Sequence, residues 1–231
     1  GRLVGGASGF RDVGVQVFDT FQRRHLALSY AIMVSNGRRG VIDEDASKDV
    51  TARTMVSYVF SGEASDPHRQ ELSLFAWGQR GERDVGGVTA QRIRSGAGVH
   101  LEKEPIRIRA EIVYASGAIP AGPTPPFADQ PIVVDPYGRA IGGYLQARVR
   151  LLDRARVGLR YEELHRQIDD PRALRISRTL APMVEYDIVP RVRLQASYEK
   201  RWLEAPGGTP DARTIAASMG DRVAVQATVI F

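Results

Sequence analysis

The last ten residues, Arg222-Val-Ala-Val-Gln-Ala-Thr-Val-Ile-Phe231, alternate between two kinds of side chain. Every second residue is apolar: Val223, Val225, Ala227, Val229 and Phe231. Successive side chains of a strand point to opposite faces, so an extended conformation gathers these residues on one face. A helix would need apolar residues three and four positions apart, and the spacing does not fit. This stretch therefore predicts a β-strand with one apolar face.

The same period of two recurs along most of the chain. In 191–199, for example, apolar Val192, Leu194, Ala196 and Tyr198 alternate with polar residues. The pattern predicts about eleven strands, at 13–17, 26–34, 51–60, 71–80, 90–101, 105–114, 144–151, 155–162, 176–187, 191–199 and 222–231. Most are close to the roughly 9–11 residues with which a tilted strand crosses a bilayer. We therefore predict one all-β domain over 1–231, a transmembrane antiparallel up-and-down β-barrel.

The predicted connections alternate in length. Short ones fall at 19–24, 61–68, 102–105, 152–155 and 187–190, and longer ones at 36–48, 80–88, 116–138, 163–175 and 202–219. Short turns on one side and long loops on the other are typical of bacterial outer-membrane barrels. The proline-rich connection 116–138 is stiff enough to fold into such a barrel, although a plain external loop is an equal alternative.

Arginines occupy the polar positions of many predicted strands. They are Arg53, Arg107, Arg109, Arg148, Arg150, Arg156, Arg160, Arg191 and Arg193. An arginine facing lipid at the bilayer midplane costs roughly 2–4 kcal/mol, so this face must point into the barrel. A lumen lined with guanidinium groups attracts small anions. The alternative is that the arginines pair with acids such as Glu111, Glu162 and Glu199 and stiffen the wall.

Aromatic residues and the end of the chain agree with a membrane protein. Tyr58, Phe60, Tyr114, Tyr161 and Tyr198 fall on the apolar faces, mostly near strand ends, where interfacial aromatic girdles lie. The final strand, ending on aromatic Phe231, resembles the assembly signal of bacterial outer-membrane barrels. That resemblance implies recognition by the barrel-assembly machinery.

Several segments, in order, resemble the phosphate-selective porin O and P family. They are Arg11-Asp-Val-Gly-Val-Gln-Val, Leu28-Ser-Tyr-Ala-Ile-Met-Val-Ser-Asn-Gly37, Lys48-Asp-Val-Thr-Ala-Arg53, Gly143-Tyr-Leu-Gln-Ala, Val157-Gly-Leu-Arg-Tyr-Glu162 and the tail from Val223 to Phe231. The resemblance implies homotrimers of barrels of about 16 strands, with basic ladders and passage of small anions such as phosphate. This chain departs from the family in length and in having only three lysines, Lys48, Lys103 and Lys200.

The strand count leaves two architectures open. A barrel of this class has an even number of strands and both ends in the periplasm. An odd count therefore predicts one of two architectures. In the first, about five N-terminal strands are missing from a barrel of about 16 strands. In the second, the chain is a complete barrel of about 12 strands, one of which the alternation does not reveal.

Composition and motifs narrow the function. The chain has no cysteine, which excludes disulfides and thiolate metal sites. Its four histidines show no ligand spacing and no Gly-x-Ser-x-Gly or His-Glu-x-x-His occurs, so we expect no catalytic residue, metal or cofactor. The formal charge of +5 comes from arginines spread along the chain, which argues against a nucleic-acid binder. We expect an anion channel in a Gram-negative outer membrane, contacting lipid and lipopolysaccharide. The alternative is a structural or assembly barrel whose lumen is plugged.

Overall fold

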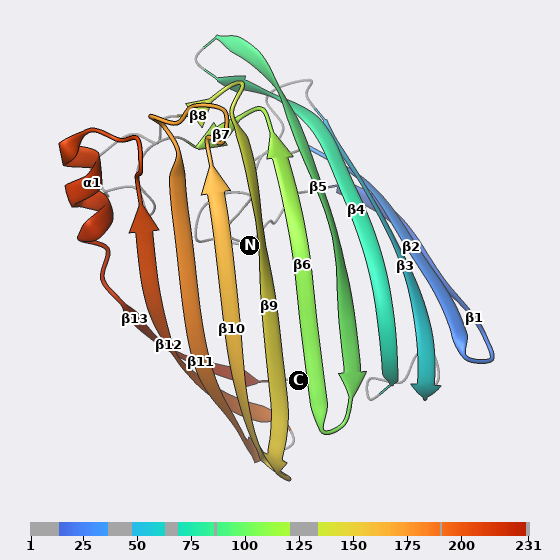
Figure 1. Ribbon diagram of the computed structural model, residues 1–231. Helices are drawn as coiled ribbons and strands as arrows, with labels where there is room; N and C mark the ends of the chain where they lie inside the picture. The colour runs from blue at the N-terminus through green and yellow to red at the C-terminus, as the bar shows by residue number, and fades with distance from the viewer. Residues whose placement is uncertain are drawn as a thin grey trace.

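The computed structural model describes residues 14–36, 48–62, 69–85, 87–120, 134–189 and 191–229. Its main feature is one antiparallel sheet of eleven strands, in which each strand pairs with the next sheet strand along the chain (Figure 1). In order these are β1 (Gly14–Arg23), β2 (Leu26–Ser35), β3 (Asp49–Ser61), β4 (Gln70–Val85), β5 (Val88–Lys103), β6 (Ile106–Ser116), β9 (Arg139–Leu152), β10 (Ala155–Arg166), β11 (Arg175–Val189), β12 (Val192–Glu204) and β13 (Arg222–Val229). The predicted all-β, up-and-down antiparallel fold is confirmed.

Each predicted strand overlaps one strand of this sheet, but three connections differ from the prediction. Residues 19–24 were predicted as a short connection, whereas β1 continues to Arg23 and the turn to β2 is formed by Arg24 and His25 alone. Residues 80–88 were predicted as a long loop, whereas β4 and β5 continue into this segment as a hairpin whose last paired residues are Val85 and Val88. Gly81 and the charged residues Glu82, Arg83 and Asp84 suggested a loop, yet their backbone positions pair with those of β5. The connection 202–219 contains a helix, α1 (Pro210–Ala217).

Pro182 lies inside β11, where a proline removes one backbone donor. It is paired in register with Leu159 of β10. The register with β12 skips this point, running from Leu180 opposite Lys200 to Met183 opposite Ser197. The strand therefore tolerates the proline by interrupting one ladder.

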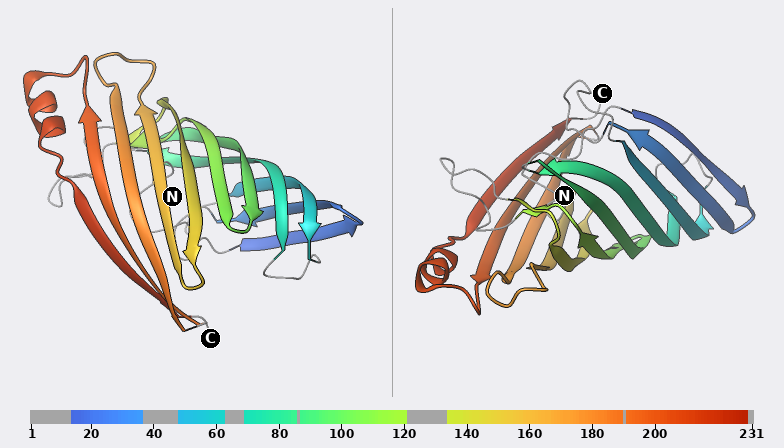
Figure 2. Two further views of the ribbon diagram at one scale, coloured as in Figure 1. Left: turned by 60° about the horizontal axis from the view of Figure 1, so that its bottom comes forward. Right: turned by 90° about the horizontal axis from the view of Figure 1, so that it is seen from above.

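The sheet curves into a trough, seen from its end in the right panel of Figure 2. Among the described residues, β1 pairs only with β2 and β13 only with β12, so both form edges. A two-stranded sheet, β7 (Ile119–Pro120) and β8 (Val134–Asp135), lies within the curve (Figure 2). No helix of the described residues is long and apolar enough to span a membrane.

The register divides side chains between two faces. The inner face, on the concave side, carries the odd positions of β3, β4, β6, β11 and β12 and the even positions of β5, β9, β10 and β13. The outer face exposes large apolar side chains on nearly every strand, among them Val17, Phe21, Leu28, Ile32, Val56, Leu74, Ile112, Leu145, Leu159, Val184 and Val225. A contiguous apolar surface of this extent requires a partner other than water.

The two ends of the strands differ. At the short-turn end lie tight turns such as Glu104–Pro105 and Asp153–Arg154. At the long-connection end lie the β4–β5 hairpin tip, 167–174 and 205–221, and there β2 and β6 end and β3 and β9 begin. There Thr209 is the N-cap of α1, and its side-chain oxygen accepts a hydrogen bond from the Ala212 amide. The helix packs Ala216 against Leu203 of β12.

Asp221, between α1 and β13, ties that connection back to β12. Its carboxylate accepts hydrogen bonds from Tyr198 Oη, from Lys200 Nζ at 3.0 Å and from the Arg201 amide at 3.2 Å. These donors, Tyr198 first, hold the pKa of Asp221 below its ordinary value.

Candidate functional site

The inner face gathers nearly all of the arginines that the sequence singles out. The register places Arg53, Arg107, Arg109, Arg148, Arg150, Arg156, Arg160 and Arg193 on it. Arg191 instead lies in the turn before β12 and is exposed. The sheet thus brings together residues from five strands that lie up to 140 positions apart (53 to 193) in the sequence.

At the short-turn end, Glu102 and Glu104 bind three of these arginines. Arg107 lies 3.2 Å from Glu102 and 3.0 Å from Glu104. Arg109 contacts Glu102 at 2.6 Å, and Arg150 of β9 reaches Glu104 at 2.6 Å. The positive charge of this part of the wall is therefore largely compensated by acids at the β5–β6 turn.

A second set of ion pairs joins β9, β10, β11 and β12 at the same end. Arg148 contacts Glu185 at 2.7 Å, and the Glu185 side chain is only 2% exposed. Asp187 accepts from Arg156 at 2.5 Å and from Arg193 at 2.7 Å. We call these two sets together the ladder: Glu102, Glu104, Glu185 and Asp187 with Arg107, Arg109, Arg148, Arg150, Arg156 and Arg193.

Nearer the middle of the strands, two arginines lie over aromatic rings. The Arg53 guanidinium lies 4.8 Å from the centroid of Phe75, and no ion pair joins it to a carboxylate among the described residues. The Arg160 guanidinium lies 4.5 Å from the centroid of Tyr144 and also contacts Glu162 at 2.9 Å. A ring face attracts a cation without neutralising it, so Arg53 keeps its full charge toward the concave space.

Two further inner-face arginines, Arg92 and Arg94 of β5, were not singled out from the sequence. Arg94 donates to the carbonyls of Ser116, Gly117 and Ala118, at the start of the connection that holds β7 and β8. Arg92 donates to buried Asp49 at 2.9 Å. Their spacing of two places them on one face, but the glycines that follow in β5 obscured the alternation.

The beginning of the connection 116–138 folds onto the inner face. Ile119 of β7 is 1% exposed and packs with Ala115, Ala140 and Leu164, which belong to β6, β9 and β10. Gly117 adopts a φ of +68°, and a Cβ there would lie 1.8 Å from the Gln91 carbonyl oxygen. Of the two alternatives open from the sequence, the described part of this connection follows the inward one.

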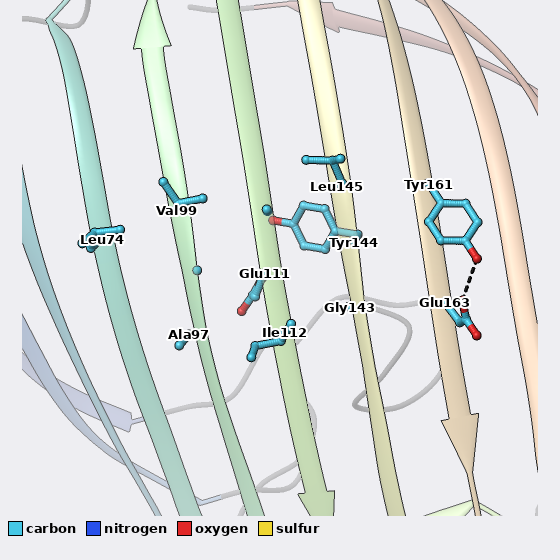
Figure 3. Close-up of a pocket in the computed structure, with 12 residues that line it drawn as sticks. Leu74, Ala97, Val99, Glu111, Ile112, Gly143, Tyr144, Leu145, Tyr161 and Glu163 are labelled. Carbon is cyan, nitrogen blue, oxygen red and sulfur yellow. Dashed lines mark hydrogen bonds between the residues drawn. The ribbon is translucent and has the colours of Figure 1, made fainter.

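The outer face carries the predicted aromatic positions Tyr58, Phe60, Tyr114, Tyr161 and Tyr198. It also has a shallow, open groove across β4, β5, β6, β9 and β10. Leu74, Val99, Leu145 and Tyr161 lie along one row of it and small Ala97, Ala110 and Gly143 line it (Figure 3). Its end is polar, because Tyr161 Oη donates to Glu163 Oε2 at 2.6 Å.

Phe231, the predicted assembly signal, lies outside the described residues. Within the described ranges, no group of three or more His, Asp or Glu residues could hold a metal ion. No protein-family model matches the chain, and a search of curated proteins finds no significant match.

Proposed function

We propose that this chain forms the wall of an outer-membrane β-barrel whose inner face lines a water-filled channel favouring small anions. The observation that carries the proposal is the division of the sheet into an exposed apolar outer face and an inner face rich in arginine. Hydrocarbon suits the outer face, and water must reach the inner one, because guanidinium groups in lipid are costly.

Closure of the barrel is part of the proposal. Edge strands β1 and β13 expose most of their residues, and an open edge in hydrocarbon would leave backbone groups without partners. Further strands between these edges, to about 16 in total, would complete a porin of the phosphate-selective type. In that architecture we expect a homotrimer in a Gram-negative outer membrane, in contact with lipopolysaccharide, and assembled by the barrel-assembly machinery.

The selectivity would come from the excess of arginines over carboxylates on the inner face. On the inner face of the described strands arginines outnumber acids, because Arg53, Arg201 and Arg222 add to those of the ladder, while Glu111, Glu162 and Glu199 add to the carboxylates. Such a surface raises the local concentration of anions. Phosphate is one anion that a planar guanidinium suits.

The ladder favours a second candidate, a structural or assembly barrel. Its ion pairs stiffen the wall and leave little charge for solutes at the short-turn end. In this case the concave space would be filled by protein, and the described base of the connection 116–138 is already seated there.

Reversal potentials across a planar bilayer, measured in a salt gradient, decide between the two. The channel proposal expects conductance with most of the current carried by chloride. Cation-dominated current would refute anion selectivity, whereas purified protein that inserts but does not conduct would favour the structural barrel.

A further inference from the structure

A row of side chains crosses the middle of the inner face in an ordered sequence of charges and rings. From β3 to β10 it reads Arg53, then Phe75 and Trp77, then Glu111, then Tyr144 and Arg160. Each of the two arginines lies over a ring, at 4.8 Å for Arg53 on Phe75 and 4.5 Å for Arg160 on Tyr144. Glu111 lies between the two aromatic groups, accepts from Trp77 Nε1 at 2.6 Å, and is directly opposite Tyr144.

Two glycines of β5 allow the rings of this row to lie against the sheet. A Cβ at Gly98 would be 2.5 Å from Phe75 Cζ, and one at Gly96 would be 2.6 Å from Trp77 Nε1. Both rings therefore cover the backbone of β5, where a side chain would otherwise stand. Phe75 is only 7% exposed beneath Arg53, whereas Trp77 stays half-buried, so the ring that remains accessible beside Arg53 is the Trp77 indole.

The Arg53 guanidinium is placed to receive a ligand. Its face rests on Phe75, so its N–H edge is left for an acceptor. His100 packs on the same ring at 4.7 Å between centroids, and Arg109, with a side chain 46% exposed, is directly opposite His100. The half-buried Trp77 indole adjoins this positive group in the register, opposite Arg53.

A bare inorganic anion would use only the N–H donors of such a site. A planar anion with a π system would use those donors through its carboxylate and would also stack on the Trp77 indole and on the outer guanidinium face. We propose that this row, centred on Arg53, Phe75 and Trp77 and bordered by Arg109 of the ladder, is a binding site for aromatic carboxylates. The inference rests on the proposed water-filled lumen and names the class of anion that lumen prefers.

Tryptophan fluorescence in detergent tests the site without requiring conduction. The chain has two tryptophans, Trp77 and outer-face Trp202, so Trp202→Phe leaves Trp77 as the only reporter. Benzoate should change its emission saturably. Cyclohexanecarboxylate, matched in charge and size but without a π system, should bind at least about fivefold more weakly, and inorganic phosphate should also bind more weakly.

Two variants in the Trp202→Phe background separate charge from planarity. Arg53→Lys keeps the charge but removes the planar fork, and it should reduce the preference for benzoate over cyclohexanecarboxylate. Arg191→Gln, in the exposed turn, should leave benzoate binding unchanged. Equal binding of the two carboxylates, or benzoate binding indifferent to Arg53→Lys, would overturn the proposal.

Bilayer recordings on the same protein distinguish this failure from failure of the channel. A chain that conducts chloride but shows no benzoate preference keeps the proposed function and loses this site. A chain that binds benzoate at Trp77 yet does not conduct keeps the site and loses the open channel.

Discussion

The ladder and the row around Arg53 both contain arginines of the inner face, but these arginines contact different kinds of partner. In the ladder, arginines face carboxylates such as Glu185 and Asp187 at 2.5 to 2.7 Å. At mid-height, Arg53 faces the ring of Phe75 and keeps its charge. The comparison teaches that the number of arginines lining a wall does not set its potential; the partner of each one does.

The largest effect should follow from breaking the ladder at its most buried member. Glu185→Gln leaves Arg148 without its carboxylate, and because that arginine is partly exposed we expect a loss of about 2–3 kcal/mol in unfolding free energy, less than for a fully buried pair. Urea unfolding of the refolded protein measures it. Glu204→Gln, at an exposed outer-face pair, should change stability by less than about 1 kcal/mol. Equal losses would contradict the distinction.

The second largest effect should follow from changing the backbone of β5, on which the rings of Phe75 and Trp77 lie. Gly98→Val places side-chain atoms where Phe75 Cζ and the Ala110 carbonyl oxygen already lie, at 2.5 and 2.3 Å from the new Cβ. We expect a loss of about 1–3 kcal/mol from overpacking, together with weaker benzoate binding. Gly78→Val is the matched control, because its Cβ meets only the Arg94 carbonyl oxygen at 4.0 Å. Unaltered benzoate binding in Gly98→Val would show that the position of the Phe75 ring does not affect the binding site.

Arg94 adds a third kind of partner to the comparison of the ladder with the row around Arg53. Its guanidinium donates to backbone carbonyl groups. Arg94→Gln removes donors to Ser116, Gly117 and Ala118. Amide exchange at Gly117 and Ala118 should accelerate about tenfold, which corresponds to about 1.4 kcal/mol. Exchange in the middle of β10 serves as the internal reference. No acceleration would mean that Ile119 alone holds this connection on the sheet.

The smallest effect concerns selectivity itself. In the proposed channel, Arg53→Gln removes one charge that acts over about 10 Å of water, so a passing anion loses about 0.4 kcal/mol and a passing cation gains about 0.4 kcal/mol. The anion-to-cation permeability ratio should therefore fall about fourfold. Arg191→Gln, in an exposed turn, should shift the reversal potential less. A larger shift for Arg191→Gln would move the selective region from mid-height to the turn.

The sequence was sufficient to predict the strands but not to predict which side chains the arginines contact. A period of two assigns the existence of each strand and the face of every arginine singled out except Arg191, which lies in a turn, and the register agrees with the alternation in β6, β9 and β10. Pairs such as Arg148 with Glu185 join β9 to β11 across an intervening strand, a relation that no local pattern contains. The positions of the Trp77 and Phe75 rings over Gly96 and Gly98 could not be predicted either, because these glycines interrupt the alternation of side chains in β5.

The β4–β5 hairpin also has a practical consequence for determining orientation. Beyond Arg80 and Ile93 its two strands pair only with each other, so its tip extends past the neighbouring strands (Figure 1). At that tip Gly87 has a φ of +84° and open space around its Cβ position. Exposed tips of this kind accept inserted peptides. If the chain forms the proposed membrane barrel, an epitope tag placed beside Gly87 and probed with antibody on intact cells would show which side of the membrane the long connections face.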